Sequence, residues 1–311
     1  MSNLNPIKLS PVFKDYLWGG NKLVSEYNKK CALSKVAESW ELSVHKDGES
    51  IVANGEFKGL KLSEYIKNNP GVSGKRAKAF ENFPILIKFI DAKDNLSIQV
   101  HPDDEYALKN NGEYGKTEMW YILDCEEDSF LYYGFNKEIT KEEFKESIEN
   151  NTLLNYLNKV KVNKGDVFFI EAGTVHAIGK GIVICEIQQN SNTTFRVYDY
   201  DRIDKDGNKR PLHIKEAIEV SKTIPAKNYK RDGNILAKCK YFTVEELIVT
   251  DKAQLKVTED SFKSVIVTEG YGKIKNGDFA IEINKGDSIF IPAQNANFEI
   301  SGNCKLIVSY V

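Results

Sequence analysis

The sequence predicts a mainly β protein of two related antiparallel barrels or jelly rolls with a few short helices. Apolar or alternating runs bounded by glycine and proline recur along the 311 residues, as is typical of strands. A strand–turn–strand pattern also occurs twice, at 162–178 and 283–300, each time with an Asn-Lys-Gly-Asp turn. A strand pair repeated in this way indicates two copies of one β architecture.

The first part of the chain is predicted to consist of short strands and one helical insertion. Strands are expected at 8–13 and 37–45, the second because its residues alternate with period two. A helical insertion is expected at about 60–82, where apolar residues have helical spacing. An apolar strand at 84–90 follows.

Further strands are predicted at 97–101, 119–123, 129–133 and within 160–187. We expect 119–123 and 129–133 to form a hairpin. A second helical insertion, at about 140–158, begins with the capping-box pattern Thr140-Lys141-Glu142-Glu143. A short helix is expected at 213–221. The repeat suggests a domain at 1–230 with both insertions and a second, degenerate β domain at 231–311.

Composition excludes several classes of function. The formal net charge is −2 and 28% of residues are charged, so no basic surface for nucleic acid is indicated. No apolar run has the roughly 18 residues of a membrane span, and the first residues lack a signal-peptide pattern. The five cysteines are scattered and form no CxxC pair, as expected in a reducing compartment. We therefore expect a cytoplasmic protein that binds neither nucleic acid nor membrane.

Polar residues that could form one site gather in the stretch 96–118. Gln99 and His101 lie two apart on a predicted strand, so both side chains point to one face. Lys116 and Glu118 form a second such pair at the start of the next strand. His176 lies at a strand end within the first copy of the repeat, whereas the second copy has Asn297 at the matching place. The sequence predicts that one barrel carries a site and the other lacks it.

Imidazole and carboxylate together are ligands that a divalent ion such as Zn²⁺ accepts. Gln99 is the weakest of the four candidate ligands, because glutamine is an uncommon zinc ligand. From the residues alone, a metal site and a structural role for the two histidines both stay open.

Five motifs occur in order along the chain: Tyr16-Leu17-Trp18-Gly19-Gly20, Glu38-Ser39-Trp40-Glu41, Ser97-Ile98-Gln99-Val100-His101-Pro102-Asp103, Gly115-Lys116-Thr117-Glu118-Met119-Trp120-Tyr121 and Gly173-Thr174-Val175-His176-Ala177. Together they resemble one enzyme family, type I mannose-6-phosphate isomerases in their short bacterial form. The similarity runs from about residue 6 to the C-terminus. It implies a cupin-type fold and an aldose–ketose isomerase that interconverts mannose 6-phosphate and fructose 6-phosphate through an enediol.

The resemblance also implies a zinc cofactor, one ion per chain, and roles for individual residues. The family's metal ligands fall on Gln99, His101, Glu118 and His176, its catalytic arginine on Arg196 and its motif lysine on Lys116. Many relatives have tyrosine where this chain has Ile178, so a hydroxyl donor near the metal is missing or is supplied from elsewhere.

The sugar phosphate needs further contacts, and the expected oligomeric state is a monomer or a homodimer. Trp18 is a candidate for stacking on the sugar, and Arg196, Arg202 and Lys88, in that order, are candidates for binding the phosphate. Two other functions are considered. A non-catalytic sugar-binding or regulatory cupin would bind sugar without metal. A metal-dependent dioxygenase would use two histidines and one carboxylate, but Gln99 and the cationic residues argue against it.

Overall fold

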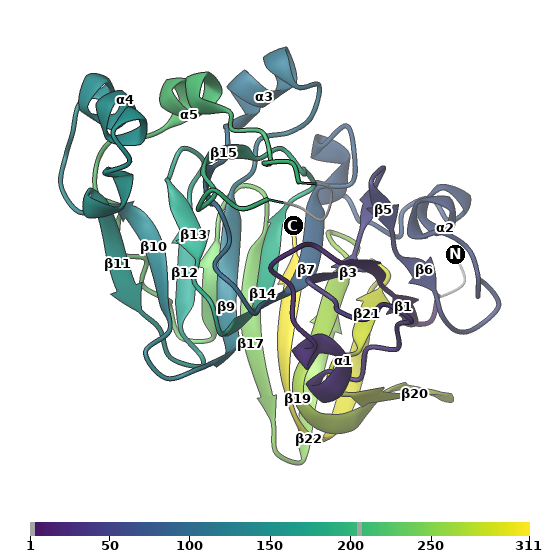
Figure 1. Cartoon of the computed structure of the whole chain (residues 1–311). Helices are drawn as coiled ribbons and strands as arrows, with labels where there is room; N and C mark the ends of the chain where they lie inside the picture. The colour runs from purple at the N-terminus through teal and green to yellow at the C-terminus, as the bar shows by residue number, and fades with distance from the viewer. Residues whose placement is uncertain (1–3, 204–206) are drawn as a thin grey trace.

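The computed structural model describes residues 4–203 and 207–311, and strands dominate it (Figure 1). Two sheets form the first barrel-like body. In sheet order, the six-stranded sheet contains β12 (Val167–Ile170), β9 (Glu118–Cys125), β14 (Ile182–Gln189), β7 (Ile85–Ala92), β3 (Glu38–Leu42) and β2 (Val12–Lys14). The five-stranded sheet contains β11 (Leu157–Lys161), β10 (Phe130–Phe135), β13 (His176–Ile178), β8 (Ile98–Val100) and β15 (Phe195–Tyr198).

A third, nine-stranded sheet holds the C-terminal part of the chain. Its main path is β16 (Ile235–Lys238), β17 (Thr243–Val249), β22 (Ala296–Tyr310), β19 (Lys263–Asn276), β21 (Ser288–Ile291), β1 (Ile7–Ser10) and β6 (Ile51–Val52). Beside this path, β18 (Lys252–Val257) pairs with β22 and β20 (Phe279–Asn284) pairs with β19. A small ribbon joins β4 (Val44–His45) to β5 (Gly48–Glu49). The mainly β fold is as predicted.

The five- and six-stranded sheets pack face to face around a shared apolar core. Ile90 and Trp120 of the six-stranded sheet belong to one buried cluster with Leu131 and Ile178 of the five-stranded sheet. All four are at most 3% exposed. The inward side of each strand is therefore apolar except where the polar residues of the site interrupt it.

The Asn-Lys-Gly-Asp turn of the sequence repeat has the same local structure in both copies. Gly165 and Gly286 adopt φ values of 90° and 93°, a region that glycine enters without steric cost. The aspartate after each glycine accepts a hydrogen bond from the turn's asparagine N–H, at 2.7 Å for Asp166 and 2.9 Å for Asp287. Each glycine N–H donates to the carbonyl of an inner strand, over 2.8 Å in both copies. The two turns are thus built alike.

The predicted hairpin between 119–123 and 129–133 is wrong. β9 pairs with β12 and β14 in the six-stranded sheet, whereas β10 pairs with β11 and β13 in the five-stranded sheet. The chain between them, where Asp128 has φ 60°, passes from one sheet to the other. An alternating sequence does not reveal which sheet a strand joins, because both sheets bury the same kind of face.

The helices lie at the edges of the sheets, and Figure 1 shows α3, α4 and α5 together at one end of the first body. They are α1 (Lys22–Glu26), α2 (Leu62–Asn68), α3 (Asp104–Asn110), α4 (Lys141–Glu149) and α5 (Ile214–Val220), with the 3₁₀ turns η1 (Arg76–Ala79) and η2 (Leu153–Asn155). The predicted insertions correspond to α2 with η1 and to α4 with η2. The capping box forms: Thr140 Oγ1 accepts from the Glu143 N–H at 3.0 Å. Helices α1 and α3 were not predicted.

The N-terminal strands connect the two halves of the chain. β1 pairs with β21 and β6 pairs with β1, so both belong to the nine-stranded sheet. A buried ion pair of 2.7 Å joins Lys29 to Glu41, and Lys29 also donates to the carbonyl of Gly286 in the second repeat. The division of the chain at residue 230 stays a prediction. Two strands from the N-terminal side of that division, β1 and β6, belong to the nine-stranded sheet.

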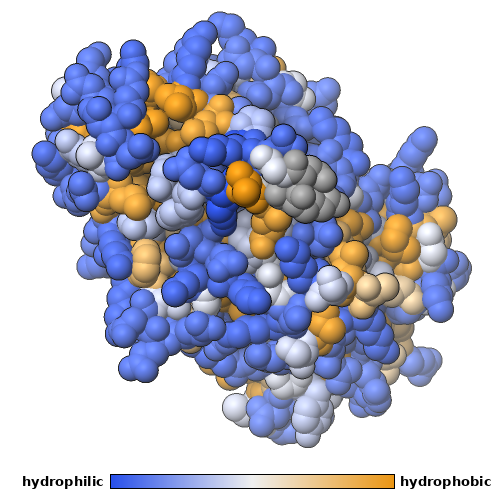
Figure 2. Space-filling model, viewed as in Figure 1, coloured by the Kyte–Doolittle hydropathy of each residue, from blue (hydrophilic) through white to orange (hydrophobic). Residues whose placement is uncertain are grey.

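Hydrophilic side chains cover most of the face seen in Figure 2. Large apolar side chains that remain exposed, such as Leu108 and Ile248, belong to separate elements. Among the helices within 4–203 and 207–311, none has both the length and the apolar character needed to cross a membrane.

Candidate active site

Three residues that the sequence placed in the site converge between the facing sheets. His176 opens β13 and is in register with Gln99 of the adjacent β8, and His101 follows β8 directly. Glu118 opens β9 in the opposite sheet. Its Oε1 lies 3.3 Å from His176 Nε2 and 3.8 Å from His101 Nε2. Within the described ranges, these three are the one group of three or more His, Cys, Asp or Glu side chains close enough to hold a metal ion.

Backbone carbonyls orient both imidazoles. His101 Nδ1 lies 2.9 Å from the carbonyl oxygen of Thr193, and His176 Nδ1 lies 2.8 Å from that of Thr174. A carbonyl can only accept, so each Nδ1 carries the hydrogen and each Nε2 presents its lone pair toward Glu118. This is how ligand histidines are usually held from behind.

The atoms that face one another also suit a cation. Glu118 Oε1 and His176 Nε2 are buried and have no hydrogen-bond partner, which is costly unless something else binds them. The other two atoms that face this point, His101 Nε2 and Glu118 Oε2, are contacted by Lys116. Its ammonium lies 3.2 Å from His101 Nε2 and forms a close ion pair with Glu118 Oε2. Two imidazole nitrogens and a carboxylate are a typical zinc donor set. The residues present therefore fit a divalent metal.

Burial keeps the two histidines in the form that binds metal. Desolvation lowers the pKa of His176 to about 4 and that of His101 well below its ordinary value. Both imidazoles are therefore neutral at pH 7. Burial and the neighbouring Glu186 raise the pKa of Glu118, so its carboxylate form depends on the positive charges placed beside it, of which Lys116 is one.

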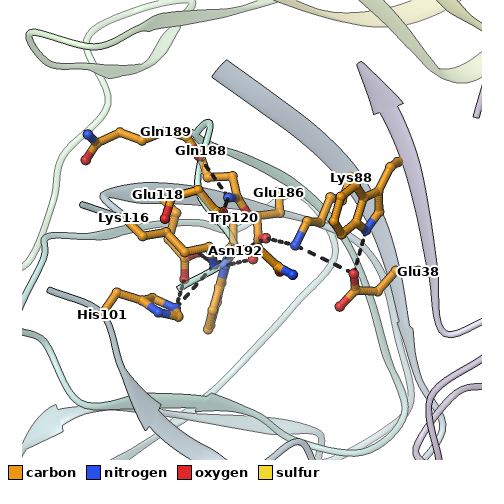
Figure 3. Close-up of polar contacts among 12 residues, drawn as sticks. Glu38, Lys88, His101, Lys116, Glu118, Trp120, Glu186, Gln188, Gln189 and Asn192 are labelled. Carbon is orange, nitrogen blue, oxygen red and sulfur yellow. Dashed lines mark hydrogen bonds and ion pairs between the residues drawn. The ribbon is translucent and has the colours of Figure 1, made fainter. Parts of the chain in front are cut away.

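A row of buried charges extends from Glu118 across the inner face of the six-stranded sheet (Figure 3). Glu186 Oε1 lies 3.5 Å from Lys116 Nζ and 3.7 Å from Lys88 Nζ, and Lys88 Nζ lies 3.6 Å from Glu38 Oε2. Indole N–H groups hold the two carboxylates: Trp120 donates to Glu186 at 2.9 Å and Trp40 donates to Glu38 at 2.7 Å.

The alternation of charges decides which groups in the row are ionised. Burial alone would raise the pKa of Glu186, but Lys116 and Lys88 outweigh that effect and lower it. Likewise, burial lowers the pKa of Lys88, but Glu38 and Glu186 reverse the direction and raise it. At neutral pH the row therefore presents a carboxylate flanked by ammonium groups.

A cavity of about 240 Å³ opens above this row. Its cationic lining comes from Lys88, Lys116, Arg196 and Arg210, and Gln99 lies in its wall. The remaining lining residues are Tyr16, Trp18, Glu38, Ile90, Leu96, Ser97, Ile178, Glu186, Asn192 and Thr194. Ile178 and Tyr16 both belong to this lining, so a tyrosine hydroxyl is present near the cavity even though position 178 has none.

The structure brings most of the sequence-predicted residues to this cavity. Trp18, Lys88, Lys116 and Arg196 line it, with Arg196 in register with Gln99 across β15 and β8. Arg202 is not among the described residues of the lining. It contacts Asp199 closely and donates to the Asn95 carbonyl at 2.6 Å.

Among the lining residues to which the sequence analysis gave no role are two charged ones, Arg210 and Glu186. Arg210 donates to Asp199 at 2.6 Å and lies in the cavity wall that Arg202 was expected to supply. Glu186 is a charged residue within the apolar strand β14. The signal for Glu186 was present, since an acidic side chain in a strand buried on both sides requires a partner.

Known proteins resemble the chain over nearly its whole length. The family description for the phosphomannose isomerase type I catalytic domain matches residues 7–130, and that for the mannose-6-phosphate isomerase cupin domain matches residues 233–311. Mannose-6-phosphate isomerase ManA of Bacillus subtilis is 40% identical, with 98% of this chain and 99% of that protein covered. The mannose-6-phosphate isomerase of Streptococcus mutans is 36% identical over 98% of each chain.

Solved structures agree with these sequence matches. The crystal structure of the mannose 6-phosphate isomerase from Bacillus subtilis superposes with a TM-score of 0.91 at 36% identity, covering 99% of this chain and 100% of that one. A structure from Archaeoglobus fulgidus at 24% identity, with a TM-score of 0.81, shows the same fold. The chain therefore belongs to the type I mannose-6-phosphate isomerases, the family that its motifs resemble.

Proposed function

We propose that this chain interconverts mannose 6-phosphate and fructose 6-phosphate as a metal-dependent aldose–ketose isomerase that works through an enediol. The observation that carries the proposal is the convergence of His101, Glu118 and His176 beside a cavity rich in cationic side chains. Family membership supports it, because relatives identical at 36–40% over nearly the full chain carry the name mannose-6-phosphate isomerase.

The proposed cofactor is one zinc ion per chain, held by His101, Glu118 and His176 with Gln99 as the fourth ligand. When bound, such an ion polarises a substrate oxygen as a Lewis acid. Gln99 lines the same cavity and its strand is in register with His176, which supports its inclusion.

Positive side chains of the cavity stabilise the charge that develops on the enediol. Arg196 reaches the cavity from β15, and its guanidinium donates to the Pro211 carbonyl at 2.9 Å. Its Nε is buried and has no hydrogen-bond partner. Lys116 adds a second positive charge from the opposite sheet. Donors fixed in advance in a buried site cost no reorganisation during the reaction.

The proton that moves between the two carbons has two candidate carriers in the chain. These are the Lys116 amine and the Glu186 carboxylate, whose atoms lie 3.5 Å apart at the cavity floor. The ionised Glu186 can accept a proton, and the adjacent ammonium can supply one. Glu186 lies on β14, and Lys116 lies two residues before β9 begins in the same sheet. The fold therefore fixes the distance between the two side chains.

Arg210, together with Arg196, is the proposed partner of the 6-phosphate. Its guanidinium lines the cavity and is held by two hydrogen bonds to Asp199, at 2.8 and 2.6 Å. A guanidinium held in this way keeps donors free for an incoming phosphate. Trp18 and Tyr16 supply the apolar and phenolic wall for the sugar. We further propose a cytoplasmic location, which the five free cysteines support. The proposed oligomeric state is a monomer or a homodimer.

The proposal is tested by an assay against a panel of hexose 6-phosphates, with metal content measured on the same protein sample. We expect mannose 6-phosphate and fructose 6-phosphate to be turned over, and His176→Ala to lose both bound metal and activity. Asn297→Ala is the matched control, because it changes the equivalent, exposed position of the second repeat. Undiminished turnover in His176→Ala would contradict the proposal.

A further inference from the structure

The segment 190–194, between β14 and β15, contacts both the metal-ligand residues and the cavity. The carbonyl of Thr193 holds His101 Nδ1 at 2.9 Å, and this bond points His101 Nε2 at Glu118. Asn192 and Thr194 line the cavity wall. The position of this segment therefore affects the orientation of one metal ligand and the shape of the sugar pocket together.

Glu113 holds this segment in place from outside the cavity. Its Oε2 accepts hydrogen bonds from the Asn192 N–H and from the Thr193 hydroxyl, both at 3.3 Å. A second acidic residue, Asp47, accepts from the Asn192 side-chain amide at 2.8 Å. Asn192 and Thr193 thus donate three hydrogen bonds to two carboxylates. These bonds fix two consecutive residues of a segment that contains no regular secondary structure.

Glu113 is itself positioned by a buried histidine. His45, 5% exposed, accepts from the Asp47 N–H at Nδ1 over 3.1 Å, so its Nε2 carries the hydrogen. That Nε2 lies 3.6 Å from Glu113 Oε2. Lys46 contacts the other carboxylate oxygen at 2.6 Å, but its side chain is 71% exposed.

We propose that Glu113 is a positioning residue that orients His101 through the Thr193 carbonyl and shapes the substrate pocket through Asn192. The proposal rests on the proposed isomerase function and adds a contact chain that lies outside the cavity. Glu113 touches neither the metal ligands nor the cavity. Its effect passes through the segment 190–194, as expected of outer groups that hold a ligand histidine.

Glu113→Ala is the principal test. We expect zinc affinity, measured by competition with a chromophoric chelator, to fall about 10–100-fold, the range typical for loss of an outer-shell partner. The KM for mannose 6-phosphate should also rise, because Asn192 loses its backbone anchor. A group that stabilised the fold alone would change the melting temperature and leave both constants of the folded protein unaltered.

Lys46→Ala is the matched control. It removes the exposed ion pair with the same carboxylate and leaves the contacts to Asn192 and Thr193 intact, so zinc affinity and KM should stay close to those of the unmodified chain. Glu113→Gln retains an acceptor oxygen and should recover most of the affinity. If Glu113→Ala does not fold, Thr193→Val still removes one of the two bonds and should weaken zinc binding several-fold.

The outcomes separate this inference from the proposed function. An unmodified chain that binds zinc but does not isomerise mannose 6-phosphate overturns the function, and the chelator competition still tests the role of Glu113. An active chain whose Glu113→Ala variant keeps its zinc affinity and KM overturns the inference. Equal losses in Lys46→Ala and Glu113→Ala would also contradict it.

Discussion

At the scale of single residues, Lys116 links the proposed metal site to the reacting part of the cavity. Its ammonium contacts His101 and Glu118 on one side and lies 3.5 Å from Glu186 on the other. A divalent ion and this ammonium repel each other, because both carry positive charge within a few ångströms in a buried setting. Lys116 is therefore expected to serve the proposed reaction and to oppose the binding of metal.

This opposition predicts an unusual variant. Lys116→Met should bind zinc at least as tightly as the unmodified chain, because a repelling charge is removed. Its turnover of mannose 6-phosphate should fall by about 10²–10³, the typical cost of losing one electrostatic donor. Zinc competition and steady-state kinetics on one preparation test both parts. Weaker zinc binding would show that Lys116 supports the ligands instead.

The phosphate proposal predicts different effects for two neighbouring arginines. Arg210→Ala should raise the KM for mannose 6-phosphate about 10–100-fold, since a charge-assisted hydrogen bond contributes roughly 1.5–3 kcal/mol. Arg202→Ala is the matched control: it also removes an Asp199 partner, but Arg202 lies outside the cavity lining. Steady-state kinetics on both variants is the measurement. A larger effect in Arg202→Ala would reverse the order proposed for these two residues.

The sequence could group those site residues that have a local pattern, and the structure also places them together. Gln99 and His101 share a strand face, and Lys116 and Glu118 open the next strand, so spacing alone grouped them. Arg210 could not be found in this way. It reaches the cavity from an irregular segment, and its distance from Arg196 depends on the path of the chain between them.

At the scale of elements, Asp104, the first residue of α3, forms hydrogen bonds to three other parts of the chain near the site. One carboxylate oxygen accepts from the Gly115 N–H at 2.9 Å and from Gln189 Nε2 at 2.8 Å, and the other accepts from the Tyr241 hydroxyl at 2.7 Å. Asp104 thereby connects α3 to β14, to the segment before β9 and to the turn between β16 and β17 of the nine-stranded sheet.

Asp104→Asn tests this junction and its pH dependence. Burial raises the pKa of Asp104, but its hydrogen bonds outweigh burial, so the folded-state pKa is lower than the ordinary value. Its contribution is therefore present above the unfolded pKa of about 3.9 and is lost as pH falls through the lower folded value. We expect a loss of about 1–3 kcal/mol in unfolding free energy at pH 7, shrinking toward acid pH. Denaturant unfolding at several pH values measures it, and a pH-independent difference would be contrary evidence.

Elements differed in how far the sequence revealed them. Helix α4 was predictable because its capping box is a local signal that the structure bears out at both hydrogen bonds. Helix α3 has a comparable signal, the N-cap Asp103 after Pro102, but it lies within a motif read for its site residues. The hairpin at β9 and β10 failed because strand pairing depends on long-range packing.

At the scale of the whole molecule, the Asn-Lys-Gly-Asp turn occurs twice, but only the N-terminal copy lies in the body that carries the proposed metal ligands. Within residues 4–203 and 207–311, the C-terminal body has an interior of aliphatic residues, Phe298 and Cys304, and no second group of ligands is found. It packs instead against the N-terminal segment, where Gly286 approaches the carbonyl of Tyr27. The second body therefore supports the chain around the site.

Gly286→Ala tests the contact between the two bodies. An alanine Cβ at this position would lie 1.9 Å from the Tyr27 carbonyl oxygen, with φ at +93°. We expect a loss of roughly 3 kcal/mol or more in unfolding free energy, combining overpacking with backbone strain. Gly277→Ala is the control, because its φ is also positive but no described atom lies within 4 Å. Equal losses in thermal or denaturant unfolding would mean that strain alone is responsible.

The proposed function requires one divalent ion, held by His101, Glu118 and His176, for isomerisation. The most direct measurement is a titration of chelator-stripped chain with zinc, in which bound metal and turnover of mannose 6-phosphate are followed together. We expect turnover to rise in proportion to bound zinc and to stop rising at one ion per chain. Full turnover by chain without bound metal would contradict this requirement.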